Sequence, residues 1–136
     1  MKKYLVLQTN GVLKEVHEED YSSSYEMLKE NVEGCIECVS FIKDFRKKGI
    51  DLWINEEGKL IDLLPTIAIL SDEEIVEILN GNIVFARVND EGETLPLNDD
   101  DIEFIRKTLT KKIGFLQYRS GFSGTELRNM VSFVEM

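Results

Sequence analysis

An Asn10-Gly11 dipeptide between two short apolar segments is the sequence feature that most constrains what this chain can fold into. Both central positions of a type I′ turn need a positive φ, and Asn-Gly meets that need with little strain. The flanking segments, 4–8 and 12–16, are therefore predicted to pair as an antiparallel hairpin. The chain is expected to begin with a β-sheet.

Further strands are expected where short apolar runs lie between turn residues. A turn at 55–58 predicts a second hairpin, made by 50–54 and a returning strand at 59–64 that ends at Pro65, which lacks a backbone donor. The segment 82–88 is apolar on both of its alternating faces, which is typical of a strand in the middle of a covered sheet. Two other strands are predicted, at 35–41 and 113–118.

Helix-start signals occur at four places, each followed by apolar residues at helical spacing. Three have a capping-box pattern, in which glutamate follows serine at the third position, and the fourth begins after an asparagine. The predicted starts are Ser23–Glu26, Ser71–Glu74, Asn98 and Ser123–Glu126. The fold class is therefore α+β: a small mixed or antiparallel sheet built from hairpins, with about four short helices.

The chain has 136 residues, of which 43% are hydrophobic, so one domain can bury a core without disulfides or a bound metal. No apolar run approaches the roughly 20 residues that span a bilayer. The first residues do not have the pattern of a secretion signal. A cytoplasmic protein with reduced cysteines is expected, away from membranes.

Charge is distributed unevenly along the chain. The net charge is −10, which makes free nucleic acid an unfavourable partner. Positions 72–103 hold 11 acidic residues and one basic residue, Arg87, whereas positions 106–128 are mainly basic. The total charge is therefore less informative than its position.

The acidic segment supports the hypothesis that the protein binds a partner protein with a basic surface, because complementary charges attract. This hypothesis requires the carboxylates to converge on one face. The competing interpretation is an ordinary solvated surface that maintains solubility. The candidate binding residues are Asp72, Glu73, Glu74, Glu77, Asp90, Glu91, Asp99, Asp100, Asp101 and Glu103.

A glycine-containing loop before the last predicted helix suggests a different class of function. Free backbone N–H groups at a helix N-terminus, together with basic side chains, are typical of a phosphate site. The alternative function is therefore a module that binds or sequesters a nucleotide or another phosphate ligand. The residues involved are Lys112, Arg119, Ser120, Gly121, Ser123 and Gly124.

The sequence predicts no catalytic residues, cofactor or metal site. Cys35 and Cys38 have the spacing of zinc and redox motifs, but zinc needs about four ligands and the chain offers only His17 besides them. Within a strand the two thiols would point to opposite faces, which favours a structural role. A non-enzymatic protein is expected, with an unrecognised enzyme as the third alternative.

Several blocks of sequence carry a family resemblance, at 32–37, 50–60, 65, 81–84 and 90–93. In order and spacing they resemble the DUF3846 family of small phage and mobile-element proteins, over about residues 1–109. The resemblance implies a phage or mobile-element origin, and so a location in the cytoplasm of a bacterial host cell. Together with the acidic segment, it leads us to expect an accessory protein that acts by binding, for example as an inhibitor of a host or defence protein. It divides the chain into a domain at 1–110 and a strand-loop-helix extension at 111–136, packed on the same domain or, through its helix, on a second copy.

Overall fold

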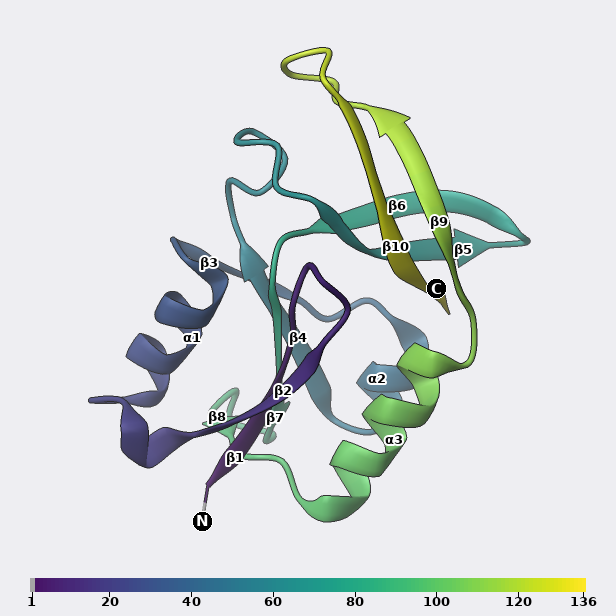
Figure 1. The fold of residues 1–136 in the computed structure, drawn as a ribbon. Helices are drawn as coiled ribbons and strands as arrows, with labels where there is room; N and C mark the ends of the chain where they lie inside the picture. Colours follow the sequence, from purple (N-terminus) through teal and green to yellow (C-terminus); the bar gives the residue numbers. More distant parts are fainter. Residues whose placement is uncertain (1) are drawn as a thin grey trace.

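The computed structural model describes residues 2–136 and confirms the α+β class: over these residues, two β-sheets combine with three α-helices (Figure 1). The strands are Lys3–Leu7 (β1), Leu13–His17 (β2), Ile36–Val39 (β3), Ile50–Asn55 (β4), Pro65–Ser71 (β5), Glu74–Asn80 (β6), Ile83–Val88 (β7), Thr94–Leu95 (β8), Ile113–Arg119 (β9) and Glu126–Glu135 (β10). The first sheet has the order β2-β1-β7-β4-β3, with β8 also paired to β7. The second sheet has the order β6-β5-β10-β9.

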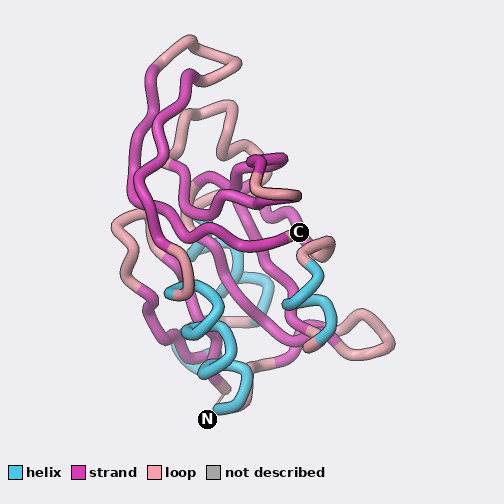
Figure 2. Tube along the Cα trace, turned by 90° about the vertical axis from the view of Figure 1, so that its right-hand side faces the viewer, coloured by secondary structure: helices cyan, strands magenta, loops and turns pink. Residues whose placement is uncertain are grey.

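The helices are α1 (Ser24–Val32), α2 (Lys43–Lys47) and α3 (Asp99–Thr110), and a 3-10 turn spans Glu18–Asp20. α1 covers one face of the first sheet, whereas α2, α3 and the second sheet lie on its opposite face (Figures 1 and 2). Within residues 2–136, the helices are too short or too polar to cross a membrane.

The two faces of the first sheet build two cores. Tyr4 and Val84 pack under α1, whereas Leu5 and Phe85, from the same two strands, pack against Ile67 of the second sheet. Each such buried side chain stabilises the fold by about 1.5–3 kcal/mol. The central strand β7 is therefore buried on both faces, which confirms the prediction for 82–88.

The N-terminal hairpin and two of the predicted helices are also confirmed. β1 and β2 pair antiparallel as predicted. The predicted type I′ turn is wrong, because Gly11 has a φ of 85° but Asn10 does not have a positive φ; the Gly11 N–H instead donates to the Gln8 carbonyl at 2.9 Å, which closes a longer loop. Ser23 caps α1 by accepting a hydrogen bond from the Glu26 N–H at 3.1 Å. Asn98 and Asp101 cap α3 reciprocally, each side chain accepting from the other residue's backbone N–H.

The helix predicted after Ser71 is wrong, because this segment forms the β5–β6 hairpin. Asp72 and Glu73 occupy the turn with φ values of 51° and 69°, the positive values that a tight hairpin turn needs. A register irregularity near Val76 interrupts the alternation of β6. The extra residue of the bulge shifts the apolar side chains of β6 out of strict alternation, so their spacing resembles that of a helix.

The final helix is also wrong, because residues 126–135 form β10 between β9 and β5. β10 pairs antiparallel with β9 and parallel with β5. Val131 and Val134 lie on opposite faces of β10 and both are buried. Because apolar residues lie on both faces of this strand, their spacing coincides with that of a helix. The predicted dimer through a C-terminal helix is therefore no longer supported, since this segment is a strand.

The predicted strand at 59–64 is a turn segment, so the second predicted hairpin is wrong as well. After this turn the chain leaves the first sheet and enters the second at Pro65. Pro65 begins β5, a position where a missing donor is tolerated. The turn at 56–64 thereby connects the two sheets.

Candidate functional site

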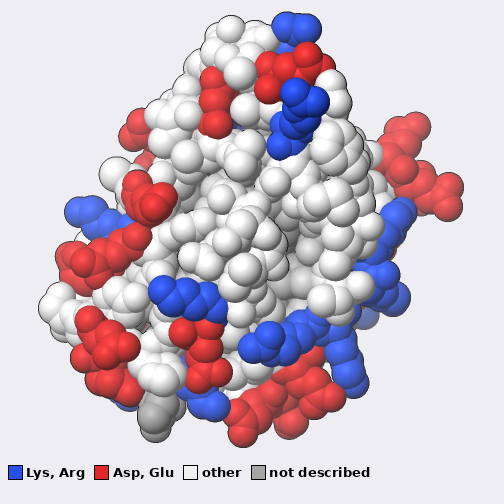
Figure 3. Space-filling model, in the orientation of Figure 1, with Lys and Arg blue, Asp and Glu red and all other residues white. Residues whose placement is uncertain are grey.

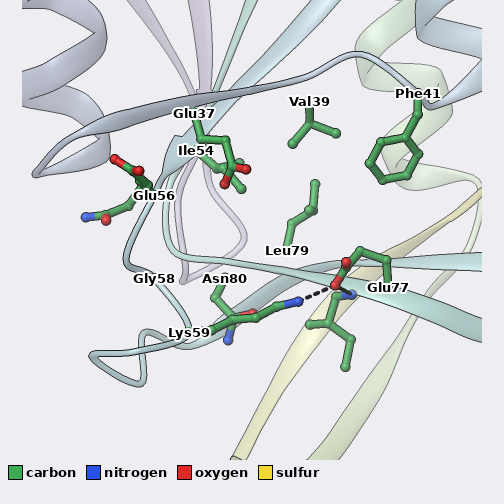
Figure 4. A pocket seen from close by; sticks show the side chains of 12 residues that line it. Glu37, Val39, Phe41, Ile54, Glu56, Gly58, Lys59, Glu77, Leu79 and Asn80 are labelled. Atoms are coloured by element: carbon green, nitrogen blue, oxygen red, sulfur yellow. Dashed lines mark hydrogen bonds and ion pairs between the residues drawn. The ribbon is translucent and has the colours of Figure 1, made fainter. Parts of the chain in front are cut away.

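A pocket of about 230 Å³ opens between the two sheets, next to their edge strands β3 and β6 (Figure 4). Glu37 and Val39 of β3 lie on one side of it, and Leu79 and Asn80 of β6 lie on the other. The turn after β4 borders one end. The lining residues are Glu37, Val39, Phe41, Ile54, Asn55, Glu56, Gly58, Lys59, Glu77, Ile78, Leu79 and Asn80.

Asn55, the last residue of β4, holds this end of the pocket in place. Its buried side chain donates from Nδ2 to the Val32 carbonyl at 3.1 Å and accepts at Oδ1 from the Glu57 N–H at 2.8 Å. A Cβ on residue 34 would stand 2.6 Å from Asn55 Nδ2, so this residue must be glycine for the Asn55 side chain to keep its position against the end of α1. The contact joins the end of α1 to the start of the turn.

Carboxylates outnumber cations around the pocket. Glu37, Glu56 and Glu77 contribute negative charges and Lys59 contributes one positive charge, so the lining carries a net charge of −2. Glu77 accepts hydrogen bonds from Lys59 Nζ and, at 2.8 Å, from the Ile78 N–H. Burial raises the pKa of the Glu77 carboxyl, but these two partners outweigh burial and the pKa is lowered overall. Glu77 is therefore ionised at neutral pH.

Asn80 provides an unused acceptor beside the pocket. Its side chain is buried, and Nδ2 donates to the Leu63 carbonyl at 2.7 Å and to the Tyr118 hydroxyl. Oδ1 has no hydrogen-bond partner within residues 2–136. An unpaired buried acceptor costs about 1–3 kcal/mol. Lys59 passes next to Asn80 at this side of the pocket (Figure 4).

The remaining walls are largely apolar, with Val39, Phe41, Ile54 and Leu79. A group that fits such a site has a positively charged donor at the end of an apolar stem, as in arginine and lysine side chains. Among the described lining residues there is no histidine, cysteine, serine or threonine. The arrangement is suited to holding a cation by negative charge, hydrogen-bond acceptors and apolar packing together.

The structure distributes the sequence-predicted acidic residues over three separate places. The β5–β6 turn and the start of α3 lie at distant ends of the molecule in Figure 1, and the β7–β8 turn is a third location. On the face shown in Figure 3, acidic and basic groups are interspersed around an uncharged centre. The residues are Asp72, Glu73, Glu74 and Glu77 in the β5–β6 hairpin, Asp90 and Glu91 in the β7–β8 turn, and Asp99, Asp100, Asp101 and Glu103 in α3.

Four of these carboxylates already pair with a cation within the fold: Glu77 with Lys59, Asp99 with Lys3, Asp101 with Arg87 and Glu103 with Lys107. Asp101 is 2% exposed and accepts from the Asn98 N–H at 3.0 Å and from Arg87 Nη1 at 3.1 Å. Glu77 is the member of the described set that lines the pocket. The structure therefore does not assemble the acidic segment into one binding face.

The loop expected to hold phosphate is the tip of the β9–β10 hairpin, not the start of a helix. Ser120 and Ser123 donate their hydroxyls to the Asp62 carboxylate, and these bonds lower the pKa of Asp62. Arg119 donates to the Gly124 carbonyl at 2.8 Å. Donors assigned to a phosphate are thus engaged by the protein itself. Gly121 lies in the same tip, and Lys112 precedes β9.

The structure does not bring the single histidine to the two thiols. Both cysteines are free and exposed, Cys35 just before edge strand β3 and Cys38 within it. His17 lies on β2 at the opposite edge of the first sheet, where its Nε2 is 3.0 Å from Glu15 Oε1. Partial burial of the sulfur and the neighbouring Asp51 raise the pKa of the Cys38 thiol to about 12. At neutral pH this thiol is protonated and a poor nucleophile.

Sequence reasoning missed most of the pocket. Glu37, Glu56, Lys59 and Asn80 come from two strands and a turn, and no local motif connects them. One signal was available, because the blocks at 32–37 and 50–60 that carry the family resemblance both contribute to the pocket. Only the fold shows that they meet at β6.

Comparison with known proteins supports the family resemblance. No curated protein and no solved structure matches the chain. The family model described as Domain of unknown function (DUF3846) matches residues 1–110, which include every residue of the pocket lining and end before β9. Because this match covers most of the sequence, the chain belongs to the DUF3846 family.

Proposed function

We propose that this protein acts by binding rather than by catalysis, and that its binding site is the pocket between β3 and β6. The group bound is the cationic end of an arginine or lysine side chain of a partner protein. The observation that supports this proposal is the lining charge of −2 beside the unpaired acceptor Asn80 Oδ1. The sequence led to the expectation of a partner with a basic surface; the proposal replaces that surface with one basic side chain of the partner, which enters this pocket.

The energetics favour a side chain on a larger partner over a free amine. A hydrogen bond to a charged group contributes about 1.5–3 kcal/mol, and each buried methylene of the stem adds about 0.8 kcal/mol. Association costs about 4–15 kcal/mol in lost translational and rotational freedom. A single cation therefore binds weakly, and useful affinity needs contacts outside the pocket.

An origin in a phage or mobile element, which the family resemblance implies, is part of the same proposal. The partner is then a protein of the bacterial host, and capture of one of its basic residues would inhibit it. This role requires no cofactor and no metal.

The proposal is tested by NMR titration with N-acetyl-arginine amide and with a capped arginine peptide. Resonances of pocket residues are expected to shift, and Glu37→Gln with Glu56→Gln to weaken binding about tenfold, because two charge-assisted contacts are lost. Asp90→Asn with Glu91→Gln makes the same charge change in the β7–β8 turn and is the matched control. Equal weakening by both pairs would contradict a specific pocket.

Lys59 occupies Glu77 as an internal cation, so its removal provides a second test. Lys59→Met keeps the apolar stem and makes the lining more negative, and it is expected to tighten binding of the arginine probe several-fold. Lys14→Met on β2 is the control for total charge. Unchanged or weaker binding in Lys59→Met would argue against a cation site at Glu77.

A further inference from the structure

The two edge strands that border the pocket differ in their free backbone groups. On β6, the Ile78 N–H donates to the Glu77 carboxylate at 2.8 Å, and Lys59 in turn pairs with Glu77. These side chains satisfy an edge donor that would otherwise be available to another strand. The protein itself therefore satisfies this donor of the β6 edge.

The β3 edge is open. The Glu56 N–H donates to the Cys35 carbonyl at 2.8 Å, and Ile36 stands opposite Asn55 in the β3–β4 register. Because bonded and non-bonded pairs alternate in an antiparallel ladder, Ile36 and Cys38 direct their backbone groups away from β4. Within residues 2–136, these outward N–H and C=O groups of Ile36 and Cys38 have no hydrogen-bond partner.

We infer, resting on the proposed function, that the ligand is an extended polypeptide segment that adds as a strand to the β3 edge. Main-chain hydrogen bonds to Ile36 and Cys38 would supply the contacts outside the pocket that a single cation lacks. The cationic side chain of this segment then enters the pocket beside Glu37.

The side-chain pattern of β3 defines the segment. Glu37 and Val39 both line the pocket and lie two residues apart on one face of the strand. An added strand presents its own side chains on that face at the same interval. The segment therefore carries a basic residue and an apolar residue two positions apart, one beside Glu37 and the other beside Val39.

Backbone recognition is tested with capped pentapeptides of sequence Thr-Arg-Thr-Val-Thr and Thr-Val-Thr-Arg-Thr, one for each strand direction. N-methylation of alternate residues produces two forms of the better binder with identical side chains. One form is expected to bind roughly tenfold or more weakly because it loses the N–H groups that face β3, and the other to bind normally. Equal affinity of both forms would overturn strand addition.

Variants of Cys38 test the same contact from the protein side. Cys38→Pro removes an outward edge donor, a replacement that edge strands accept, whereas Cys38→Ala removes the thiol and keeps the donor. Peptide binding is expected to fall about tenfold in Cys38→Pro and to be unchanged in Cys38→Ala. Thermal unfolding establishes that both variants fold. In the wild-type protein, the Cys38 amide is expected to gain protection from hydrogen exchange when the peptide binds.

The outcomes separate this inference from the proposed function. If Glu37→Gln with Glu56→Gln weakens arginine binding but neither N-methylation nor Cys38→Pro matters, the pocket stands and strand addition fails. If the carboxylate variants bind both probes normally, the proposed function fails as well. Self-association of the free protein that protects the Cys38 amide would identify a second copy as the occupant and overturn the partner segment.

Discussion

At the scale of single residues, the pocket depends on a contact that leaves no space for a side chain at position 34. The Asn55 amide occupies the volume where a Cβ of Gly34 would lie. That amide also accepts from Glu57 and donates to the Val32 carbonyl, so it cannot move without losing buried hydrogen bonds. The local chemistry of Asn55-Glu56-Glu57-Gly58 predicts a turn, but the requirement at Gly34 comes from tertiary contact.

Gly34→Ala is expected to destabilise the protein by about 1–3 kcal/mol, since the added methyl group displaces the Asn55 amide. Denaturant unfolding measures this change. Gly121→Ala is the matched control, because a Cβ there meets no atom within 4 Å, and a change of less than about 0.5 kcal/mol is expected. If both variants lost similar free energy of unfolding, the cause would be the change in backbone freedom and not the Asn55 contact.

At the scale of elements, Asp62 connects the turn between the sheets to the tip of the β9–β10 hairpin. Its φ is 52°, a conformation that costs free energy for a residue other than glycine. Its carboxylate accepts from the hydroxyls of Ser120 and Ser123, which lie far away in the sequence. The loop expected to bind phosphate is thus held by an anion that belongs to the protein.

The Asp62 contact predicts a stability difference that depends on pH. Because these hydrogen bonds lower the pKa of the folded-state carboxyl, their contribution is present above the unfolded pKa and is lost as pH falls through the folded pKa. Asp62→Asn is expected to lower the melting temperature at neutral pH and to match the wild type in strong acid. Asp90→Asn serves as the control. A constant difference at all pH values would contradict the role of the ionised carboxylate.

At the scale of the whole molecule, the second sheet combines strands from inside the region that matches the family with strands that follow it. β5 and β6 lie within the matched residues 1–110, whereas β9 and β10 lie after them. β10 pairs with β5 and contributes Val134 to the core between the sheets. Residues 111–136 are therefore an integral part of this fold.

A chain that ends at Thr110 is expected not to fold. Removal of residues 111–136 deletes Val131 and Val134 and uncovers Ile67 and Ile69, all of which are buried in the complete structure. At about 1.5–3 kcal/mol for each buried side chain, the loss matches the total stability of about 5–15 kcal/mol for a typical domain. Circular dichroism and amide dispersion, compared with the full chain, measure the outcome. A cooperative unfolding transition in the shortened chain would contradict this prediction.

The sequence by itself determined the features that depend on neighbouring residues: the hairpin around Gly11, the caps at Ser23 and Asn98, the central strand at 82–88 and the α+β class. Tertiary structure decided the state of 74–80 and 126–135, because apolar residues on two faces of a strand satisfy helical spacing equally well until their neighbours are known. It also decided the pocket, since Glu37, Lys59 and Asn80 are brought together only when β3 and β6 become the edges of adjacent sheets. Turn and cap geometry is local, whereas burial, edge position and charge convergence depend on which distant segments meet.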